Sequence, residues 1–316
     1  MTRFRKARAF SSEVETGSRQ ENASNQKPRA PFRFHRNGKG SRAARVPACA
    51  IFACAAAMLA GVTLTPTEVR ASQITACTRL DICYCVNTGY RDAISDNVAR
   101  VRQLIAGNKA TGKAIGYLSV PLSPAGGGSF AVNAEAAAKT ADRVTARMGA
   151  RSVWLLNPGA EGGSKMNGAS GADYMYMWTQ ILEGAGGLGE DFDFFYFAGP
   201  SDFASYFGLT GTGDLDRLED WFDNRVAQDP AFKQSVDAGS VTKAGFRNYY
   251  GLRASVAFSY GSHDEWNIAR LINDRRRGAT DFGIANQLSV LFDGRPVSPG
   301  GYENPAASGD VGRCIK

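Results

Sequence analysis

The chain has 316 residues, of which 43% are hydrophobic and 21% are charged. This apolar content excludes a chain that is disordered along its whole length, and one long uncharged run is too few for a multi-span membrane protein. Residues 1–71 carry 13 Lys and Arg against four Glu, so residues 72–316 carry 24 Lys and Arg against 26 Asp and Glu. The basic excess belongs to the N-terminal leader, and for the rest of the chain we expect no nucleic-acid partner.

The leader divides into a basic segment, residues 1–45, and an apolar segment, residues 46–71. The basic segment is rich in Ser, Asn, Gln and Arg and is predicted to be disordered. The apolar segment begins with 19 uncharged residues and ends in Val69-Arg70-Ala71, a pattern typical of a secretory signal peptide cleaved before Ser72. A start codon assigned too far upstream would explain the long basic segment.

We therefore expect an exported protein of bacterial type, either periplasmic or extracellular. If the leader is not cleaved, its 19-residue apolar run is just long enough to serve as a membrane anchor. The protein would then contact a membrane only through that leader.

Four cysteines remain after the leader: Cys77, Cys83, Cys85 and Cys314. An even number of cysteines in an exported chain indicates disulfides. Cys83 and Cys85 are too close along the chain to pair without strain, so we expect Cys314 to pair with one of the other three, and the partner stays open. A metal site is not expected, because no second pair of Cys or His residues lies near these cysteines in the sequence.

Residues 72–316 are predicted to form a single α/β domain in which helices and strands alternate. Apolar residues at helical spacing indicate the helices, and short apolar runs indicate the strands. Helices are predicted over residues 92–106, 131–148, 172–183, 201–207, 215–226 and 264–277, and strands over residues 114–120, 152–156, 192–197, 254–259 and 288–292. The alternation predicts a Rossmann-like three-layer sandwich with a mostly parallel sheet of about five strands.

Residues 208–250 are longer than an ordinary connection between a helix and a strand. They are predicted to form a helical insertion or flap. Six aromatic residues of this insertion are expected to be exposed: Trp221, Phe222, Phe232, Phe246, Tyr249 and Tyr250.

Ligands of open parallel sheets bind outside the carboxyl ends of the strands. Here four of the predicted strands are followed by unusual loops, two of which are the glycine-rich segments 121–129 and 161–170. Neither has the spacing of a nucleotide phosphate-binding loop, and the single histidine after the leader, His263, cannot build a histidine-rich metal site. We therefore expect a small-molecule ligand at this edge, with no cofactor and no metal.

The segment Ser262-His263-Asp264-Glu265 is the first candidate for chemistry. Glu265 would act as a carboxylate nucleophile at a sugar anomeric carbon, where the transition state is cationic. His263 is a candidate general base, and Asp202, after the strand 192–197, is a candidate second carboxylate. The structural alternative is that Ser262 and Glu265 form a capping box and that Asp202 and His263 belong to the first turns of helices.

Three further residues are candidates for substrate binding. Asn157 follows the strand 152–156, and Asp173 begins the helix 172–183. Trp178 shares a helix face with Tyr174, and an aromatic side chain at this edge could stack on a base or a sugar ring. Two of them have a structural alternative, because Asp173 also fits a helix cap and most aromatic side chains such as Trp178 belong to the core.

The segment KAIGYLSVPLS at 113–123, then a helix, then Leu155-Leu-Asn-Pro158, resembles the opening of nucleoside 2-deoxyribosyltransferase-like proteins. Those proteins begin with a strand that reads roughly Tyr-Leu-Ala-Gly-Pro, and a later motif, Gly-Ser/Thr-x-x-Glu, opens a helix. The segment 261–265 is similar to that later motif. The resemblance covers at most residues 113–275, and Val120 stands where the family has glycine.

The resemblance implies that Glu265 is the nucleophile and that Tyr117 and Pro121 line a pocket for the base. It favours an exported enzyme that transfers or hydrolyses a glycosidic bond of a nucleoside- or sugar-like molecule. The alternative hypothesis is a non-catalytic envelope or secreted protein that binds a ligand through the loop edge and the aromatic flap. Convergence of Glu265, Asp202 and Asp173 on one pocket would favour the enzyme, and their use as helix caps would favour the binding protein.

Overall fold

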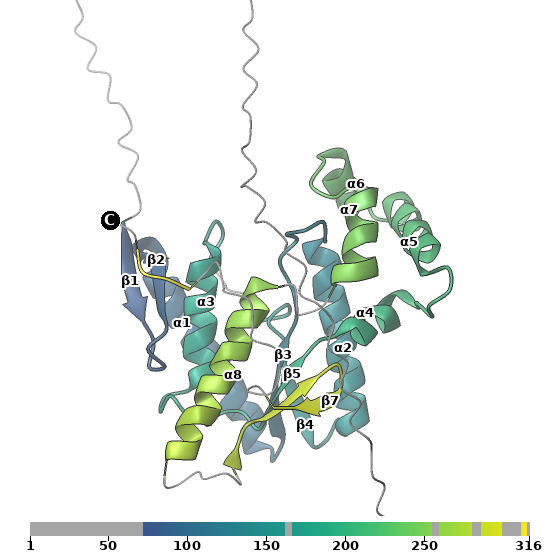
Figure 1. Ribbon diagram of the computed structural model, residues 1–316. Coiled ribbons are helices and arrows are strands. Elements are labelled where there is room, and N and C mark those ends of the chain that lie inside the picture. Colours follow the sequence, from purple (N-terminus) through teal and green to yellow (C-terminus); the bar gives the residue numbers. More distant parts are fainter. Residues whose placement is uncertain (1–71, 162–165, 255–258, 280–285, 299–310, 315–316) are drawn as a thin grey trace, which may run out of the picture. The chain divides into compact units, whose positions relative to one another are not determined.

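The centre of the fold is a five-stranded sheet in the order β4-β3-β5-β6-β7 (Figure 1). Its strands are β3 (Ala114–Ser119), β4 (Val153–Leu156), β5 (Phe194–Phe197), β6 (Ser289–Phe292) and β7 (Arg295–Val297). The first four strands in the sheet pair in parallel, and β7 runs antiparallel to β6. In this computed structural model the described residues are 72–161, 166–254, 259–279, 286–298 and 311–314.

Helices cover both faces of the sheet, so the predicted three-layer α/β sandwich is confirmed. The helices around the sheet are α1 (Arg91–Ala110), α2 (Phe130–Met148), α3 (Gly171–Glu183), α4 (Pro200–Phe207) and α8 (Tyr260–Gly278). Figure 1 shows α1, α3 and α8 on one side of the strands, and α2 and α4 on the other. The leader segments 1–45 and 46–71, and most of the predicted strand 254–259, lie outside the described residues.

The register of β3 against β5 decides which side chains meet which helices. Tyr117 pairs with Phe195, and Leu118 pairs with Tyr196. Since successive side chains of a strand point to opposite faces, Tyr117 and Tyr196 lie on opposite sides of the sheet. Tyr117 contacts Trp178 of α3, with ring centroids 6.0 Å apart, whereas Tyr196 lies against α4.

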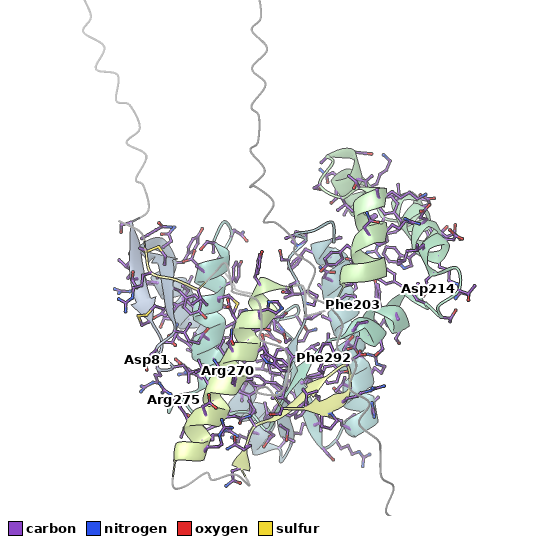
Figure 2. All side chains as sticks on the ribbon, viewed as in Figure 1. Asp81, Phe203, Asp214, Arg270, Arg275 and Phe292 are labelled. Atoms are coloured by element: carbon purple, nitrogen blue, oxygen red, sulfur yellow. A yellow bond between two sulfur atoms is a disulfide. The ribbon has the colours of Figure 1, made fainter. Side chains whose placement is uncertain are left out.

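The sequence analysis missed a two-stranded hairpin, formed by β1 (Gln73–Cys77) and β2 (Cys83–Asn87) and followed by the short 3-10 helix η1 (Thr88–Tyr90). The hairpin packs on α3, where the hydroxyls of Tyr84 and Thr179 are 2.7 Å apart and the backbone N–H of Leu80 donates to Glu183. In Figure 2 the side chains of Asp81 and Arg275 lie close together, and their ion pair of 3.1 Å links the hairpin turn to α8.

Two disulfides fix the hairpin and the C-terminal segment. Cys77 pairs with Cys83 across the hairpin, and Cys85 pairs with Cys314, with Cα atoms 4.0 and 4.7 Å apart. The C-terminal segment also pairs with β2, since the backbone N–H of Gly312 donates to the carbonyl of Cys83 at 2.9 Å. The prediction that Cys314 pairs with an N-terminal cysteine is confirmed. Across the described residues, no helix is long and apolar enough to cross a membrane.

The segment 208–250 is helical, as expected, and contains α5 (Asp214–Gln228), α6 (Pro230–Asp237) and α7 (Lys243–Asn248), followed by the π-helix η2 (Tyr249–Arg253). The expectation that its aromatic residues are exposed is wrong. Five of the six are buried and Trp221 is half-buried. They pack on one another, with Trp221 stacked on Phe246 at a centroid distance of 5.3 Å. The insertion therefore has an aromatic core of its own.

The two disulfides differ in the loop that each closes, so their contributions to stability should differ. Cys85–Cys314 joins residues 229 apart in sequence, and Cys77–Cys83 joins residues only six apart. The loop-entropy relation gives roughly 5 kcal/mol for the long loop and about 2 kcal/mol for the short one. We expect the double variant Cys85→Ser/Cys314→Ser to lose more unfolding free energy in urea than Cys77→Ser/Cys83→Ser. Equal losses, or four free thiols in the protein folded under oxidising conditions, would contradict this assignment.

Candidate functional site

A cavity of about 470 Å³ lies at the edge of the sheet where β3 and β4 end. Such a volume fits a small organic ligand. Segments that follow β3 and β4 and the N-terminal halves of α3 and α8 supply its walls. The lining residues are mostly apolar: Val120, Leu122, Ser123, Phe130, Pro158, Gly171, Tyr174, Met175, Trp178, Ser259, Gly261, Ser262 and Glu265. The sheet edge was predicted as the ligand site, and the described residues form a cavity there.

The insertion holds the cavity wall that follows β3. Gly127 has a φ of +110°, and a Cβ there would lie 2.6 Å from the carbonyl oxygen of Gly245, so only glycine fits. The Tyr250 hydroxyl accepts a hydrogen bond from the backbone N–H of Ser129 at 3.1 Å and lies 2.7 Å from Asn133 Oδ1. These contacts fix the start of α2, and with it the cavity residue Phe130, whose side chain is 56% exposed.

Helix α8 begins earlier than the sequence suggested. Its N-cap is Ser259, whose hydroxyl accepts a hydrogen bond from the backbone N–H of Ser262 at 3.3 Å. Ser262 is therefore the third residue of the helix, and the capping box expected between Ser262 and Glu265 does not form. Residues three apart lie on the same helix face, and both residues line the cavity while being only 3% and 8% exposed.

Glu265 is held by one oxygen and leaves the other without a partner. The Tyr117 hydroxyl donates to Glu265 Oε1 at 2.6 Å. Tyr117 itself is fully buried, and its ring lies 5.3 Å from that of Phe195, so the donor is fixed in the core. Within the described part of the chain, Glu265 Oε2 has no hydrogen-bond partner. A buried carboxyl oxygen without a partner costs free energy, and this one belongs to a side chain that lines the cavity.

Burial raises the pKa of Glu265 from its usual value of 4.5 to about 7. The hydroxyls of Ser119 and Tyr117 lower that pKa, although Ser119 forms no hydrogen bond of good geometry, and the charge of Asp264 raises it. Burial also raises the pKa of Tyr117, and the Glu265 charge raises it further. Tyr117 therefore stays a hydrogen-bond donor, while Glu265 changes charge near neutral pH. A carboxyl group with a pKa of this kind suits proton transfer or nucleophilic attack.

Asp202 does not join Glu265. It lies on the opposite side of the sheet, where its carboxylate accepts from the backbone N–H of Gly199 at 2.8 Å and from the Tyr196 hydroxyl at 3.0 Å. It also forms an ion pair with Arg143 of α2. Burial raises the pKa of Asp202, and the contacts with Gly199 and Arg143 oppose that shift. Each carboxylate oxygen is thus satisfied, and Asp202 closes the capping box at the start of α4.

Asp173 and Asn157 also have structural partners. Asp173 forms a capping box with Ser170 and accepts from the backbone N–H of Asn87 at 2.7 Å, so it ties α3 to the hairpin. Asn157 Oδ1 accepts from the backbone N–H of Gly159 at 2.9 Å and closes the turn after β4. Neither residue lines the cavity. Of the three predicted carboxylates, only Glu265 therefore reaches it.

The other predicted residues lie at or near the cavity in different ways. Trp178 lines it, and Tyr117 lies beneath it through its bond to Glu265. Pro121 is buried between two lining residues of the same segment and does not line the cavity itself. His263 is half-buried in the first turn of α8 and is also absent from the lining.

Sequence reasoning did not single out Ser262 or Phe130 as cavity residues. Ser262 was assigned to a cap, although its spacing of three from Glu265 already places both on one helix face. Phe130 carries no signal beyond being an aromatic residue at the start of a helix. Among the described residues, no group of three or more His, Cys, Asp or Glu side chains could hold a metal ion.

The raised pKa of Glu265 gives the stability of the fold a specific dependence on pH. The folded state holds the proton more tightly than the unfolded state, so the contribution of Glu265 to stability is greatest below pH 4.5 and falls as pH rises from about 4.5 to about 7. Each unit of difference in pKa between the folded and unfolded states corresponds to about 1.4 kcal/mol. The shift from 4.5 to about 7 therefore lowers the unfolding free energy by about 3 kcal/mol.

Glu265→Gln keeps the shape and the acceptor for Tyr117 but cannot ionise. We expect its unfolding free energy in urea to exceed that of the wild type at pH 8 and to equal it near pH 4. Glu183→Gln provides a matched control, because Glu183 is a buried glutamate of α3 that is used structurally. A Glu265→Gln variant that is less stable than the wild type at pH 8 would show that the carboxylate stabilises the fold.

No protein-family model, curated protein or solved structure matches this chain.

Proposed function

We propose that this chain is an exported protein that binds a nucleoside- or sugar-like molecule in the Glu265 cavity and cleaves or transfers its glycosidic bond. The observation that carries the proposal is the asymmetry of one carboxyl group. Glu265 lines the cavity, and its Oε1 accepts from Tyr117, whereas its Oε2 is buried and has no partner among the described residues. A carboxylate that serves only the fold would satisfy both oxygens, as Asp202 does.

The reaction requires only the ionised carboxylate. A lone pair of Glu265 Oε2 forms a bond to the anomeric carbon as the bond from that carbon to the leaving base breaks, and the base takes up the bonding electrons and a proton from solvent. Water then attacks the same carbon and loses a proton to solvent while the bond from that carbon to Glu265 breaks, which releases the sugar and regenerates the carboxylate; a second base in place of water gives transfer. Because the transition state is cationic, the carboxylate also stabilises it electrostatically.

The aromatic and apolar walls of the cavity suit the flat ring of a base, and Glu265 suits the polar sugar attached to that ring. Trp178 and Phe130 provide aromatic surfaces, and Met175 provides a polarisable thioether. The resemblance to nucleoside 2-deoxyribosyltransferase-like proteins supports the same assignment, because it implies that Tyr117 and Glu265 belong to one site. The direct hydrogen bond between them is consistent with that implication.

A second candidate function is ligand binding without catalysis. It is favoured by the use of Asp202 and Asp173 as helix caps, which leaves Glu265 as the one carboxyl group in the described cavity lining. In that case the protonated form of Glu265 would donate a hydrogen bond to the ligand. Turnover, rather than affinity, separates the two functions.

The two disulfides are typical of proteins in an oxidising compartment. This agrees with the proposed export, and we propose the periplasm or the extracellular medium as the destination.

The proposed chemistry predicts that Glu265→Gln loses turnover by several orders of magnitude while it stays folded, because the attacking oxygen anion is absent. Nucleosides and simple glycosides are screened first by release of the free base or sugar. For the active substrate, kcat/KM of the wild type should rise with pH through about 7, because only ionised Glu265 attacks.

Glu183→Gln should retain turnover, because that glutamate supports the hairpin and lies away from the cavity lining. A wild-type protein that is inert across the whole panel, or a Glu265→Gln variant with unchanged turnover, would exclude the catalytic function. Specific ligand binding without turnover would then favour the second candidate.

A further inference from the structure

The charge of the cavity comes from one residue. Among the thirteen lining residues of the described chain, Glu265 is the one acid, and no lysine, arginine or histidine accompanies it. The buried carboxylate on the other side of the sheet has the opposite arrangement, because Arg143 forms an ion pair with Asp202. For Glu265, the described groups that act on its charge are two hydroxyls and a neighbouring acid. Ionised Glu265 therefore gives the lining of the cavity a negative charge.

Three aromatic rings line the same cavity. Tyr174 and Trp178 are four residues apart in α3, a spacing that places side chains next to each other on a helix. The Tyr174 hydroxyl donates to the carbonyl of Met166 at 3.1 Å, which fixes that ring, and Trp178 is buried. Phe130 supplies the third ring from the start of α2. The cavity thus combines ordered aromatic surface with a single acid.

The ring of Trp178 lies close to the carboxyl group of Glu265. Its centroid is 6.0 Å from that of Tyr117, whose hydroxyl donates to Glu265 Oε1 at 2.6 Å. A ligand that contacts Trp178 in the cavity is therefore held near the negative charge. Attraction between charges acts across several ångströms in a medium of low polarity and needs no direct contact, so the burial of the carboxyl group does not remove it.

We propose that the cavity selects a flat aromatic ring that carries a positive charge, such as a pyridinium ring. The negative charge of Glu265 attracts such a ring through space, and the faces of aromatic side chains attract cations as well. An uncharged ring of the same shape gains the contact with the walls but neither of these two attractions.

For the reaction, this inference rests on the proposed function, and it names the class of leaving group. As Glu265 forms its bond to the anomeric carbon, the bond from that carbon to a pyridinium nitrogen breaks. The bonding electrons neutralise the nitrogen, so the base leaves without taking up a proton. A neutral nucleoside base has to be protonated as it leaves, and Glu265 cannot supply that proton while it attacks. N-glycosides of pyridinium-type bases are therefore favoured as substrates over ordinary nucleosides.

The test measures Kd by calorimetry with the full chain at pH 8, where Glu265 is ionised. It uses three probes of one shape: 3-carbamoyl-1-methylpyridinium, a cation; 3-methylbenzamide, which is neutral; and 3-methylbenzoate, an anion. None has a glycosidic bond, so the wild type leaves them intact. We expect the cation to bind about 10-fold or more tightly than the neutral probe, and the anion to bind more weakly than both.

Glu265→Gln keeps the shape of the cavity wall and removes its charge. In this variant the advantage of the cation over the neutral probe should fall to about threefold or less, the share left to the aromatic rings. The Kd of the neutral probe should change little. Glu183→Gln is the matched control, because it removes the charge of another buried glutamate that lies away from the cavity lining, and it should keep the wild-type ratio.

A second measurement uses the wild type alone. At pH 6 most of the Glu265 carboxyl groups carry a proton. A bound cation favours the ionised form of a nearby carboxyl group, so saturation with the cation should weaken the infrared band of protonated Glu265. Saturation with 3-methylbenzamide should leave that band in place. A band that the cation leaves unchanged would overturn the inference.

The outcomes separate this inference from the proposed function. A preference for the cation that depends on Glu265, in a protein without turnover, would overturn the catalysis and leave the inference standing. Equal Kd values for the cation and the neutral probe, or no binding of either at millimolar concentration, would overturn the inference. Tightest binding of the anion would also overturn it and would assign the charge preference to the N-terminus of α8. Turnover of neutral nucleosides would still support the proposed function.

Discussion

The arrangement of the site depends on one hydrogen bond, from the Tyr117 hydroxyl to Glu265 Oε1. Tyr117 lies in β3, between β4 and β5 in the sheet, and Glu265 lies in the second turn of α8, so the bond joins two layers of the fold at the base of the cavity. It fixes one oxygen of a buried carboxyl group and leaves the other oxygen unsatisfied. Burial of that group favours its neutral form and raises its pKa to about 7. Such a group is unfavourable for stability at neutral pH, and residues of this kind are typical of functional sites.

A second pair in the same fold shows what a structural carboxylate requires. Tyr196, one strand away from Tyr117, donates to Asp202 on the opposite face of the sheet. That carboxylate also accepts a backbone N–H and pairs with Arg143, so it is fully used. The two tyrosine–carboxylate pairs have similar chemistry, but of their two carboxylate residues Glu265 alone lines the cavity described above. The alternation of side chains along β3 and β5 keeps the two carboxylates apart, and it excludes a site in which they act together.

The sequence predicted the repeating pattern of the fold better than it predicted the ends of the elements. The strands that begin near residues 114, 153, 194 and 289 are short apolar runs, and the amphipathic helices between them follow from their spacing. The start of α8 was misplaced because Ser259 and Ser262 are both capable N-caps, and only the tertiary position of the helix selects Ser259. The hairpin at 73–87 was missed because two short strands with half-polar patterns give little signal.

For the candidate site, Glu265, Tyr117 and Trp178 were singled out from loop position, helix face and resemblance; Glu265 and Trp178 line one cavity, and Tyr117 lies beneath it through its bond to Glu265. Asp173 and Asp202 could not be assigned from sequence, because an acidic residue in the first turn of a helix suits a cap and a catalytic site equally well. The aromatic residues of the insertion form their own core, which depends on contacts among α5, α6 and α7 that no local pattern specifies.

The central claim is that Glu265 is a buried carboxyl group that ionises near neutral pH and faces the cavity. The direct measurement is the infrared difference spectrum between the wild type and Glu265→Gln, followed over pH 4 to 9. The account predicts a protonated-carboxyl C=O band that is present at pH 5, absent in the variant and lost with a midpoint near pH 7. Loss of that band with a midpoint close to 4.5, as for an ordinary solvated glutamate, would contradict the account.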